Sequence, residues 1–187
     1  MNKAILVLLI FLYFGSANSH ALEIADVNIP GNIKAGNTGL VLNGAGIRTK
    51  FFLKLYVGGL YLKNPNNDPQ EIINTDEEMA IKLHIISSMI TSEKMENAVN
   101  EGFENSTNGN IKPIKEEIEN FISVFKQEIK EDDVYDLVYL PDKGVDIYKN
   151  GGFFSNIKGL EFKKALFGIW LCNEPAQKSL KKSLLGL

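Results

Sequence analysis

The sequence is poor in the residues that most enzymes use for chemistry. Its 187 residues include one cysteine, Cys172, and two histidines, His20 and His84. A single cysteine excludes an internal disulfide, and so few thiols and imidazoles exclude a metal site built from several of them. Cys172 follows an apolar run and is interpreted as a small buried hydrophobe. His84 lies in Met79–Ser87, whose alternating pattern predicts a strand with His84 on its more polar face. We therefore expect neither a metal nor another cofactor.

Arginine is as scarce as cysteine. Arg48 is the one Arg among 20 Lys and Arg residues, and 23 acidic residues give the chain a net charge of −3 at pH 7. A mildly acidic chain without a basic run is not expected to bind nucleic acid. Where other cationic positions use Lys, a single guanidinium indicates a place that needs its planar fork of donors. The fork suits a carboxylate, phenolate or carbonyl group, but it equally suits a structural ion pair with an Asp or Glu across a sheet.

The first residues have the pattern of a secretory leader. Lys3 precedes an apolar run of 11 residues, Ala4–Phe14, and Ser19-His20-Ala21 offers a small-x-small cleavage site. Eleven residues are too few to cross a bilayer, which takes roughly 20. We expect a signal peptide at residues 1–21 and a domain at residues 22–187. That domain would be secreted across the inner membrane into the periplasm and would contain no membrane span.

The most informative segment is Ile47–Leu62, which alternates like one long strand. Arg48 and Tyr56 share a parity and therefore a face. Tyr61 has the opposite parity, but Gly58-Gly59 interrupts the pattern, and paired glycines in a strand indicate a bulge or bend. A bulge at these glycines would bring Tyr61 to the face of Arg48. Asn43–Gly46, just before the segment, is interpreted as a turn.

The order of elements predicts the fold class. A helix capped by Thr91 or Ser92 is followed by a second that begins near Pro113 and has an apolar stripe reaching Ile129. Strands return as a hairpin, and two helices close the chain. The ranges expected for these last elements are Val134–Leu140, Val145–Lys149, Leu160–Leu171 and a short helix between Pro175 and Gly186. Strands and helices without βαβ alternation predict an α+β domain whose antiparallel sheet has helices on one face.

Three segments together resemble the bacterial chalcone isomerase-like proteins. The first is Leu40–Leu62, with its Asn-Gly pair, the Ile-Arg-Thr-Lys sequence at 47–50 and the Leu-Tyr-Leu end. The second is Ala165–Pro175, which contains Ile-Trp-Leu, and the third is Lys181–Gly186. Their order spans nearly the whole domain. Cys172 departs from the pattern, because a Gly is expected after Trp-Leu, and this affects packing rather than function.

The resemblance implies an open-faced β-sandwich, in which a large antiparallel sheet is backed by a helical layer with an apolar cleft between them. Plant members of the superfamily cyclise chalcones, and an Arg polarises the substrate oxygens. Non-catalytic relatives bind fatty acids, whose carboxylate meets an Arg and a Tyr. Arg48 falls on the shared Arg position and Tyr61 on the Tyr of the fatty-acid binders. Tyr56 stands where the plant enzymes have a catalytic Thr, which favours binding over catalysis.

These observations support one leading hypothesis and two alternatives. The first is a non-enzymatic periplasmic protein that binds an apolar or amphipathic carboxylate such as a fatty acid, its head group held by Arg48 with Tyr61 or Tyr56 assisting. The second is an intramolecular lyase or isomerase acting on a chalcone-like enone, with Arg48 stabilising oxyanion charge. The third is an interaction module of the cell envelope without a small ligand.

Overall fold

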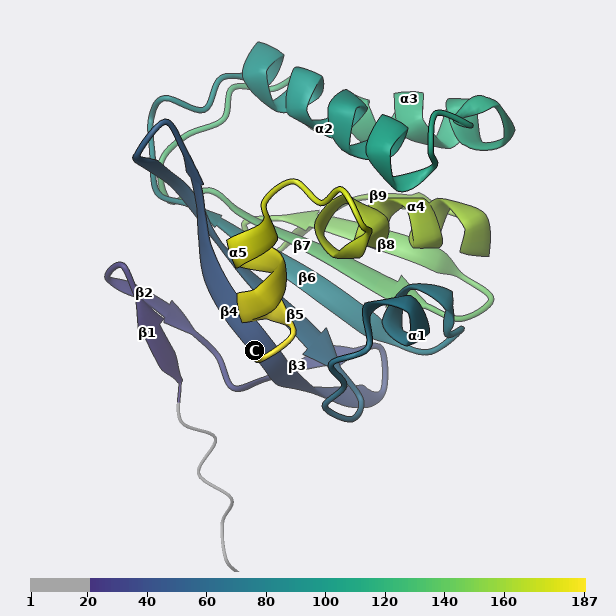
Figure 1. Ribbon diagram of the computed structural model, residues 1–187, viewed down its shortest axis with the longest axis horizontal. Helices are drawn as coiled ribbons and strands as arrows, with labels where there is room; N and C mark the ends of the chain where they lie inside the picture. The colour runs from purple at the N-terminus through teal and green to yellow at the C-terminus, as the bar shows by residue number, and fades with distance from the viewer. Residues whose placement is uncertain (1–20) are drawn as a thin grey trace, which may run out of the picture.

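A single antiparallel sheet of seven strands forms the frame of the molecule (Figure 1). The computed structural model describes residues 21–187, so the predicted leader lies outside the described residues except for Ala21. Neighbours in the sheet follow chain order from β3 to β9. The strands are β3 (Asn32–Ala35), β4 (Thr38–Lys50), β5 (Leu53–Leu62), β6 (Met79–Ile85), β7 (Val134–Leu140), β8 (Gly144–Lys149) and β9 (Gly152–Ile157).

The helices pack on one side of this sheet, which confirms the expected α+β architecture of a sheet backed by a helical layer (Figure 1). Helices α2 and α4 contact each other, and α5 lies against β4 and β5. The helices are α1 (Pro69–Asn74), α2 (Ser92–Ser106), α3 (Lys115–Ser123), α4 (Leu160–Leu171) and α5 (Lys178–Leu184), with a 3-10 turn at Lys112–Ile114. None of the helices in residues 21–187 is long and apolar enough to span a bilayer.

The predicted single strand over Ile47–Leu62 is wrong. The chain reverses at Phe51-Phe52, where both residues have positive φ (50° and 66°), and Lys50 pairs with Leu53 across the turn. Sequence patterns favour Asn-Gly at such a two-residue turn, since β-prone aromatic residues rarely adopt positive φ. The alternating sequence pattern therefore runs through the turn, because neither Phe51 nor Phe52 is a residue typical of turns.

The predicted turn at Asn43–Gly46 is also wrong, because these residues lie inside β4. Their glycines serve a close approach instead. A Cβ at Gly44 would collide with the backbone oxygen of Ser183, and one at Gly46 would lie 2.6 Å from the Ser183 Cβ. The Asn43 side chain donates to the Leu184 carbonyl at 2.8 Å. The segment is thus a docking site for α5 on the sheet.

Two apolar cores lie on the two faces of the sheet. The larger lies under the helices and includes Phe103, Phe121 and Phe162. The smaller lies on the other face, where β1 (Leu22–Ile24) and β2 (Val27–Ile29) form a separate two-stranded sheet over it. We call that two-stranded sheet the flap. The sheet is therefore covered unequally, by a thick helical layer on one face and a thin flap on the other.

A buried lysine ties two helices of the thick layer together. Lys163, in α4, is fully buried, and its Nζ donates to the carbonyls of Ile72, Ile73 and Thr75 at 3.0, 2.8 and 2.6 Å. These carbonyls lie at the end of α1, where a helix leaves its acceptors without intrahelical donors. Burial lowers the pKa of Lys163 to about 8, although Asp76 opposes the shift.

Several sequence predictions are confirmed and others fall short. α4 has the predicted bounds, and Thr91 caps α2. Cys172 is buried, and His84 lies on β6 with its Nε2 3.3 Å from Asp132. The helix predicted to reach Ile129 ends at Ser123 instead, because the following apolar residues pack into the core from an irregular loop. Helix α1 was not among the predicted elements, although its Asp68-Pro69 start is a standard cap signal.

Candidate functional site

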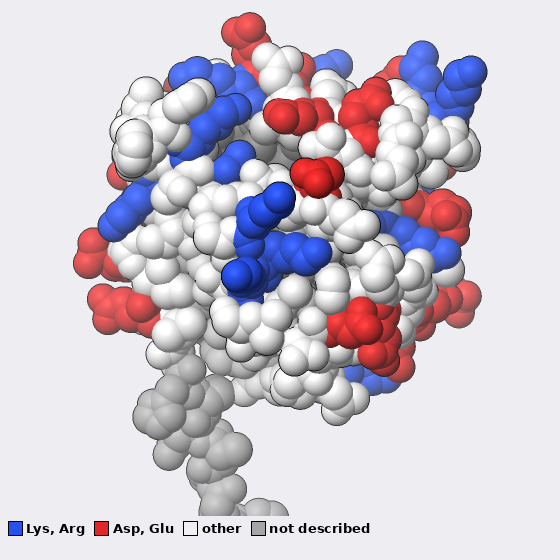
Figure 2. Space-filling view, viewed as in Figure 1, with Lys and Arg blue, Asp and Glu red and all other residues white. Residues whose placement is uncertain are grey.

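A cleft of about 530 Å³ lies between the sheet and the helical layer. Figure 2 shows its mouth as a recess below α2, with Lys and Arg side chains on the left rim. Its interior is apolar and comes from β5, β6, α2, α4 and the chain around α3. The residues that line the interior include Leu55, Tyr56, Leu83, Ile90, Met95, Val99, Phe121, Phe125, Ile169 and Trp170. A cleft of this size and lining suits a small apolar ligand.

Arg48 lines the cleft and is held from one side. Its Nη1 donates to the Thr49 carbonyl at 2.8 Å and to Oε1 of Gln177 at 3.1 Å. Within residues 21–187, the hydrogen bonds of the guanidinium use Nη1 alone and Arg48 forms no salt bridge. The alternative of a structural ion pair across the sheet therefore finds no partner in that part of the chain. The guanidinium keeps its positive charge and its remaining donors for other acceptors.

Tyr56 lies directly across the hairpin from Arg48 and on the same face. It is buried, and its hydroxyl oxygen accepts a hydrogen bond from Trp170 Nε1 at 2.9 Å. Burial raises the pKa of Tyr56, against the opposing effects of that hydrogen bond and the charge of Arg48. The phenol therefore keeps its proton at neutral pH, and no acceptor for that proton occurs among residues 21–187. It is a buried donor aimed from the same face as a guanidinium.

Tyr61 is not part of this arrangement. β5 pairs with β6 in continuous register from Tyr56 to Leu62, so the bulge expected at Gly58-Gly59 is absent from β5. The irregularities of the β4–β5 pair lie elsewhere: Asn43 is an extra residue in β4, and Leu55 is an extra residue in β5 opposite Arg48 and Thr49. Tyr61 therefore keeps its original parity and packs in the flap-side core, where its hydroxyl donates to the Pro30 carbonyl at 2.9 Å. The structure brings Arg48 and Tyr56 together and places Tyr61 on the opposite face.

Gln177 positions the guanidinium, although it was not among the predicted site residues. Gln177 is the residue before α5, and its Oε1 accepts from both Arg48 Nη1 and the Thr49 backbone N–H, the latter at 2.8 Å. Its Nε2 donates to Thr49 Oγ1 at 3.1 Å. The pair is separated by 129 positions in the chain, and no local pattern marks it. The docking of α5 onto the glycines of β4 thus also fixes the position of the Arg48 guanidinium.

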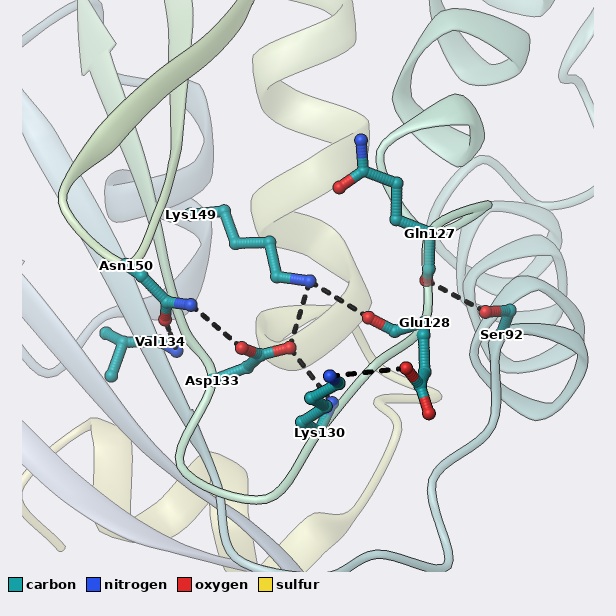
Figure 3. Close-up of polar contacts among 8 residues, drawn as sticks. All are labelled: Ser92, Gln127, Glu128, Lys130, Asp133, Val134, Lys149 and Asn150. Atoms are coloured by element: carbon teal, nitrogen blue, oxygen red, sulfur yellow. Dashed lines mark hydrogen bonds and ion pairs between the residues drawn. The ribbon is translucent and has the colours of Figure 1, made fainter.

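A polar cluster holds the loop that follows α3 against the sheet (Figure 3). Asp133 accepts from Lys149 Nζ at 2.9 Å, from the Lys130 backbone N–H at 2.9 Å and from Asn150 Nδ2 at 2.8 Å. Burial opposes ionisation of Asp133, but these hydrogen bonds outweigh it and hold the pKa of its carboxyl below the usual value. Lys149 also donates to the Glu128 carbonyl at 3.0 Å. Because Phe125 begins this loop and lines the cleft, the cluster fixes one wall of the site.

One boundary of the cleft is formed by a close approach of α2 to α4. A Cβ at Gly102 of α2 would lie 2.8 Å from Ile169, and one at Gly168 of α4 would lie 2.8 Å from the Ser106 Cβ. Gly102 and Ile169 both line the cleft. The two helices therefore touch at these glycines, and the space between them and the sheet narrows there.

The charges around the cleft are mostly positive. Arg48, Lys50 and Lys94 line it, against a single acidic residue, Glu101. Across residues 21–187 there is no group of three His, Cys, Asp or Glu residues placed to hold a metal ion. The site thus combines a cationic mouth, two polar groups with unused donors (the guanidinium and the Tyr56 hydroxyl) and an apolar interior, an arrangement that can hold a carboxylate with an apolar tail.

Comparison with known proteins agrees with this architecture. The family model of the chalcone isomerase-like proteins matches residues 21–186, so the chain belongs to that family. Among solved structures, the fold is similar to that of a fatty-acid binding protein from Arabidopsis thaliana, with a TM-score of 0.71. The match covers 89% of this chain and 96% of the other at 16% sequence identity, which establishes a shared fold. No curated protein sequence matches the chain.

Proposed function

From its membership of the chalcone isomerase-like family and from its cleft, we propose that the protein binds a fatty acid or a similar amphipathic carboxylate without transforming it. The carboxylate is held by the free donors of Arg48 and by the hydroxyl proton of Tyr56. The tail occupies the apolar interior between β5, β6, α2 and α4.

The leader predicted at residues 1–21 leads us to propose the periplasm as the compartment of the protein. Fractionation of cells that produce a C-terminally tagged chain tests this location. A tag that stays with the cytoplasm contradicts it.

The observation that carries the proposal is the state of Arg48. Its guanidinium is anchored through Nη1 by neutral oxygens and has no carboxylate partner in residues 21–187. A partly buried guanidinium without an anion is costly, and a ligand carboxylate supplies the missing charge with a forked pair of hydrogen bonds. The structural neighbour that binds fatty acids supports the same ligand class.

The tail and the head group contribute in different ways. Burial is worth about 0.8 kcal/mol for each CH₂, so a long acyl chain supplies most of the affinity. The Arg48 and Tyr56 contacts fix the orientation of the ligand and select a carboxylate over an alcohol. We therefore expect palmitate to bind more tightly than hexadecanol, which has the same chain length without the charge.

The fluorescence of Trp170 provides a direct measurement of ligand binding. It is the only Trp of the chain and it lines the cleft beside Tyr56. Titration of palmitate into the purified protein is expected to change its fluorescence saturably, and hexadecanol to do so at higher concentration. A chain with no response to palmitate, or with equal affinity for both compounds, contradicts the proposal.

Substitution of Arg48 is the test of the head-group site. Arg48→Lys keeps the charge but loses the fork, and Arg48→Gln loses both. Hydrogen bonds to charged groups contribute about 1.5 to 3 kcal/mol, so we expect Arg48→Gln to weaken palmitate binding roughly tenfold to a hundredfold and Arg48→Lys to weaken it less. The matched control is Lys143→Gln, which removes one positive charge from an exposed turn.

Two results would sink this assignment. Equal palmitate affinity in Arg48→Gln and Lys143→Gln would show that the guanidinium does not hold the head group. Loss of chalcone absorbance above the spontaneous rate, abolished by Arg48→Gln, would favour the isomerase alternative. In that case Arg48 would stabilise oxyanion charge and Tyr56 would donate a proton.

A further inference from the structure

The tip of the β4–β5 hairpin displays apolar side chains with nothing over them. We call Lys50–Lys54 the hairpin tip. Phe51 is 83% exposed, Phe52 is fully exposed and Leu53 is 42% exposed. Large aromatic side chains contribute the most when they are buried, so two of them in water at a turn are a marked exception to the pattern of the rest of the chain.

The backbone of the hairpin tip makes this exposure more significant. Both phenylalanines have positive φ, a conformation in which Asn and Gly are strongly preferred. The fold thus spends conformational energy to hold aromatic residues where a small polar turn would be more stable. Positions that break a local rule without a packing gain are expected to be functional.

The chemistry around the hairpin tip indicates what covers it. Lys50 and Lys54 flank the aromatic pair and are exposed, although the chain as a whole is acidic. Figure 2 shows this region at the upper left, as a white projection with Lys and Arg side chains beside it. Apolar side chains between lysines are the pattern of a segment that enters the interface of an anionic membrane. A second copy of the chain fits less well, because two tips in contact would bring lysines together.

The hairpin tip is also continuous with the mouth of the cleft. Lys50, Phe51 and Leu53 line the cleft, as do Met89 from the segment before α2 and Lys94 from the first turn of α2. Met89 is 47% exposed. We propose that the hairpin tip inserts Phe51 and Phe52 into the interface of an anionic phospholipid membrane and so places the cleft mouth at the lipid surface. Docking does not require that the cleft hold an acyl chain, so this inference stands apart from the proposed function.

Sedimentation with lipid vesicles tests the inference on the full chain. We expect the protein to bind vesicles of phosphatidylcholine and phosphatidylglycerol and to bind pure phosphatidylcholine vesicles more weakly. The decisive variant is Phe51→Asn/Phe52→Gly, which supplies the residues that the turn prefers. It should raise the melting temperature and lower vesicle binding by at least about tenfold.

Two further variants complete the design. Phe153→Asn removes a 61% exposed phenylalanine from β9, at the opposite edge of the sheet, and should leave vesicle binding unchanged. Lys50→Gln/Lys54→Gln should weaken binding to the anionic vesicles by about fivefold for each lysine and have little effect on the neutral ones.

The inference is overturned by any of three results. The wild-type chain could fail to bind anionic vesicles, or Phe51→Asn/Phe52→Gly could bind them as the wild type does. The third is a dimer in sedimentation velocity that Phe51→Asn/Phe52→Gly dissociates, which would assign the hairpin tip to self-association. None of these results bears on the Trp170 titration with palmitate, which contains no vesicles, so failures of the two proposals are distinguishable.

Discussion

Two tyrosines five positions apart on β5 show how differently the two faces of the sheet are built. Tyr56 enters the helix-covered face, where its oxygen accepts from Trp170 and its proton has no acceptor in residues 21–187. Tyr61 enters the flap-covered face, where its hydroxyl donates to Pro30 and its ring is fully buried. The Tyr56 hydroxyl therefore has a free proton to donate beside the cleft, whereas the Tyr61 hydroxyl already donates within the core.

The difference extends to the whole of each face. The helix-covered face combines the large core with buried polar ties, such as Lys163 on the end of α1 and Asp133 on Lys149. The flap-covered face has a smaller apolar core, and its ion pair of Lys82 with Asp136 links neighbouring strands within the sheet instead of separate layers. Polar ties hold helices at fixed positions while leaving room between them, whereas apolar contact alone favours closing every gap. The ties therefore allow a cleft on one face.

The largest expected effect comes from cutting one of these ties. Lys163→Met keeps the bulk of the side chain but leaves the carbonyls of Ile72, Ile73 and Thr75 without their shared donor. Buried unsatisfied carbonyls are costly, so we expect the free energy of unfolding to fall by about 3 to 4 kcal/mol in urea denaturation. The control is Lys164→Met, whose partly exposed ion pair with Glu161 is worth about 0.5 kcal/mol. Similar losses in both variants would contradict the role of the tie.

The effect of Lys163→Met on the free energy of unfolding should also depend on pH. Lys163 has a pKa of about 8 in the folded chain, below the value of about 10.4 for an unfolded lysine. Between these values the unfolded state holds the proton more firmly, so its contribution makes the folded state more stable as the pH rises from 8 towards 10. The stability difference between the wild type and Lys163→Met should therefore widen over this range, and parallel curves would rule out the lowered pKa.

A smaller effect is expected at the docking site of α5. Gly44→Ala places a methyl group against the Ser183 carbonyl and forces α5 away from β4. We expect a loss of about 2 to 3 kcal/mol in unfolding free energy. Because Gln177 precedes α5 and anchors Arg48, palmitate affinity should fall as well. Gly39→Ala on the same strand meets open space and is the control. Full palmitate affinity in Gly44→Ala would show that the anchor is unnecessary.

The smallest effects separate the two tyrosines. Tyr61→Phe leaves the Pro30 carbonyl without its donor and Tyr56→Phe leaves Trp170 Nε1 without its acceptor, so each should cost about 1 kcal/mol of stability. The two variants should differ in palmitate affinity measured by Trp170 fluorescence. We expect it to be about fivefold lower in Tyr56→Phe and unchanged in Tyr61→Phe. Equal affinity in both variants would remove Tyr56 from the head-group site.

Much of the frame could be predicted from the sequence, since it depends on local patterns. The bounds of α4 follow from its apolar run, and the shared face of Arg48 and Tyr56 follows from strand parity. That shared face is an accident of spacing. The two-residue turn at Phe51-Phe52 pairs residues of opposite parity, such as Lys50 with Leu53, and the extra residue Leu55 in β5 then shifts the pairing so that Arg48 lies opposite Tyr56.

The rest depends on contacts between distant parts of the chain. The glycines of Asn43–Gly46 were interpreted as turn residues, although their purpose is set by Ser183 of α5. Gln177 and Lys163 carry no local sign of the groups they bind. The bulge expected at Gly58-Gly59 is absent for the same reason, because both glycines pair in unbroken register with β4 on one side and β6 on the other.

The contact of α2 with α4 at Gly102 and Gly168 limits what the cleft can accept. The side chains of Ile169 and Ser106 fill the contact against the two glycines, so the helices are already packed closely and a ligand tail gains little room there. Another boundary of the cleft is Arg48, whose guanidinium is held in place by Gln177. A ligand whose head group is held by Arg48 therefore has a limited length of cleft for its tail, and we expect affinity to stop rising with acyl-chain length once the tail fills that space.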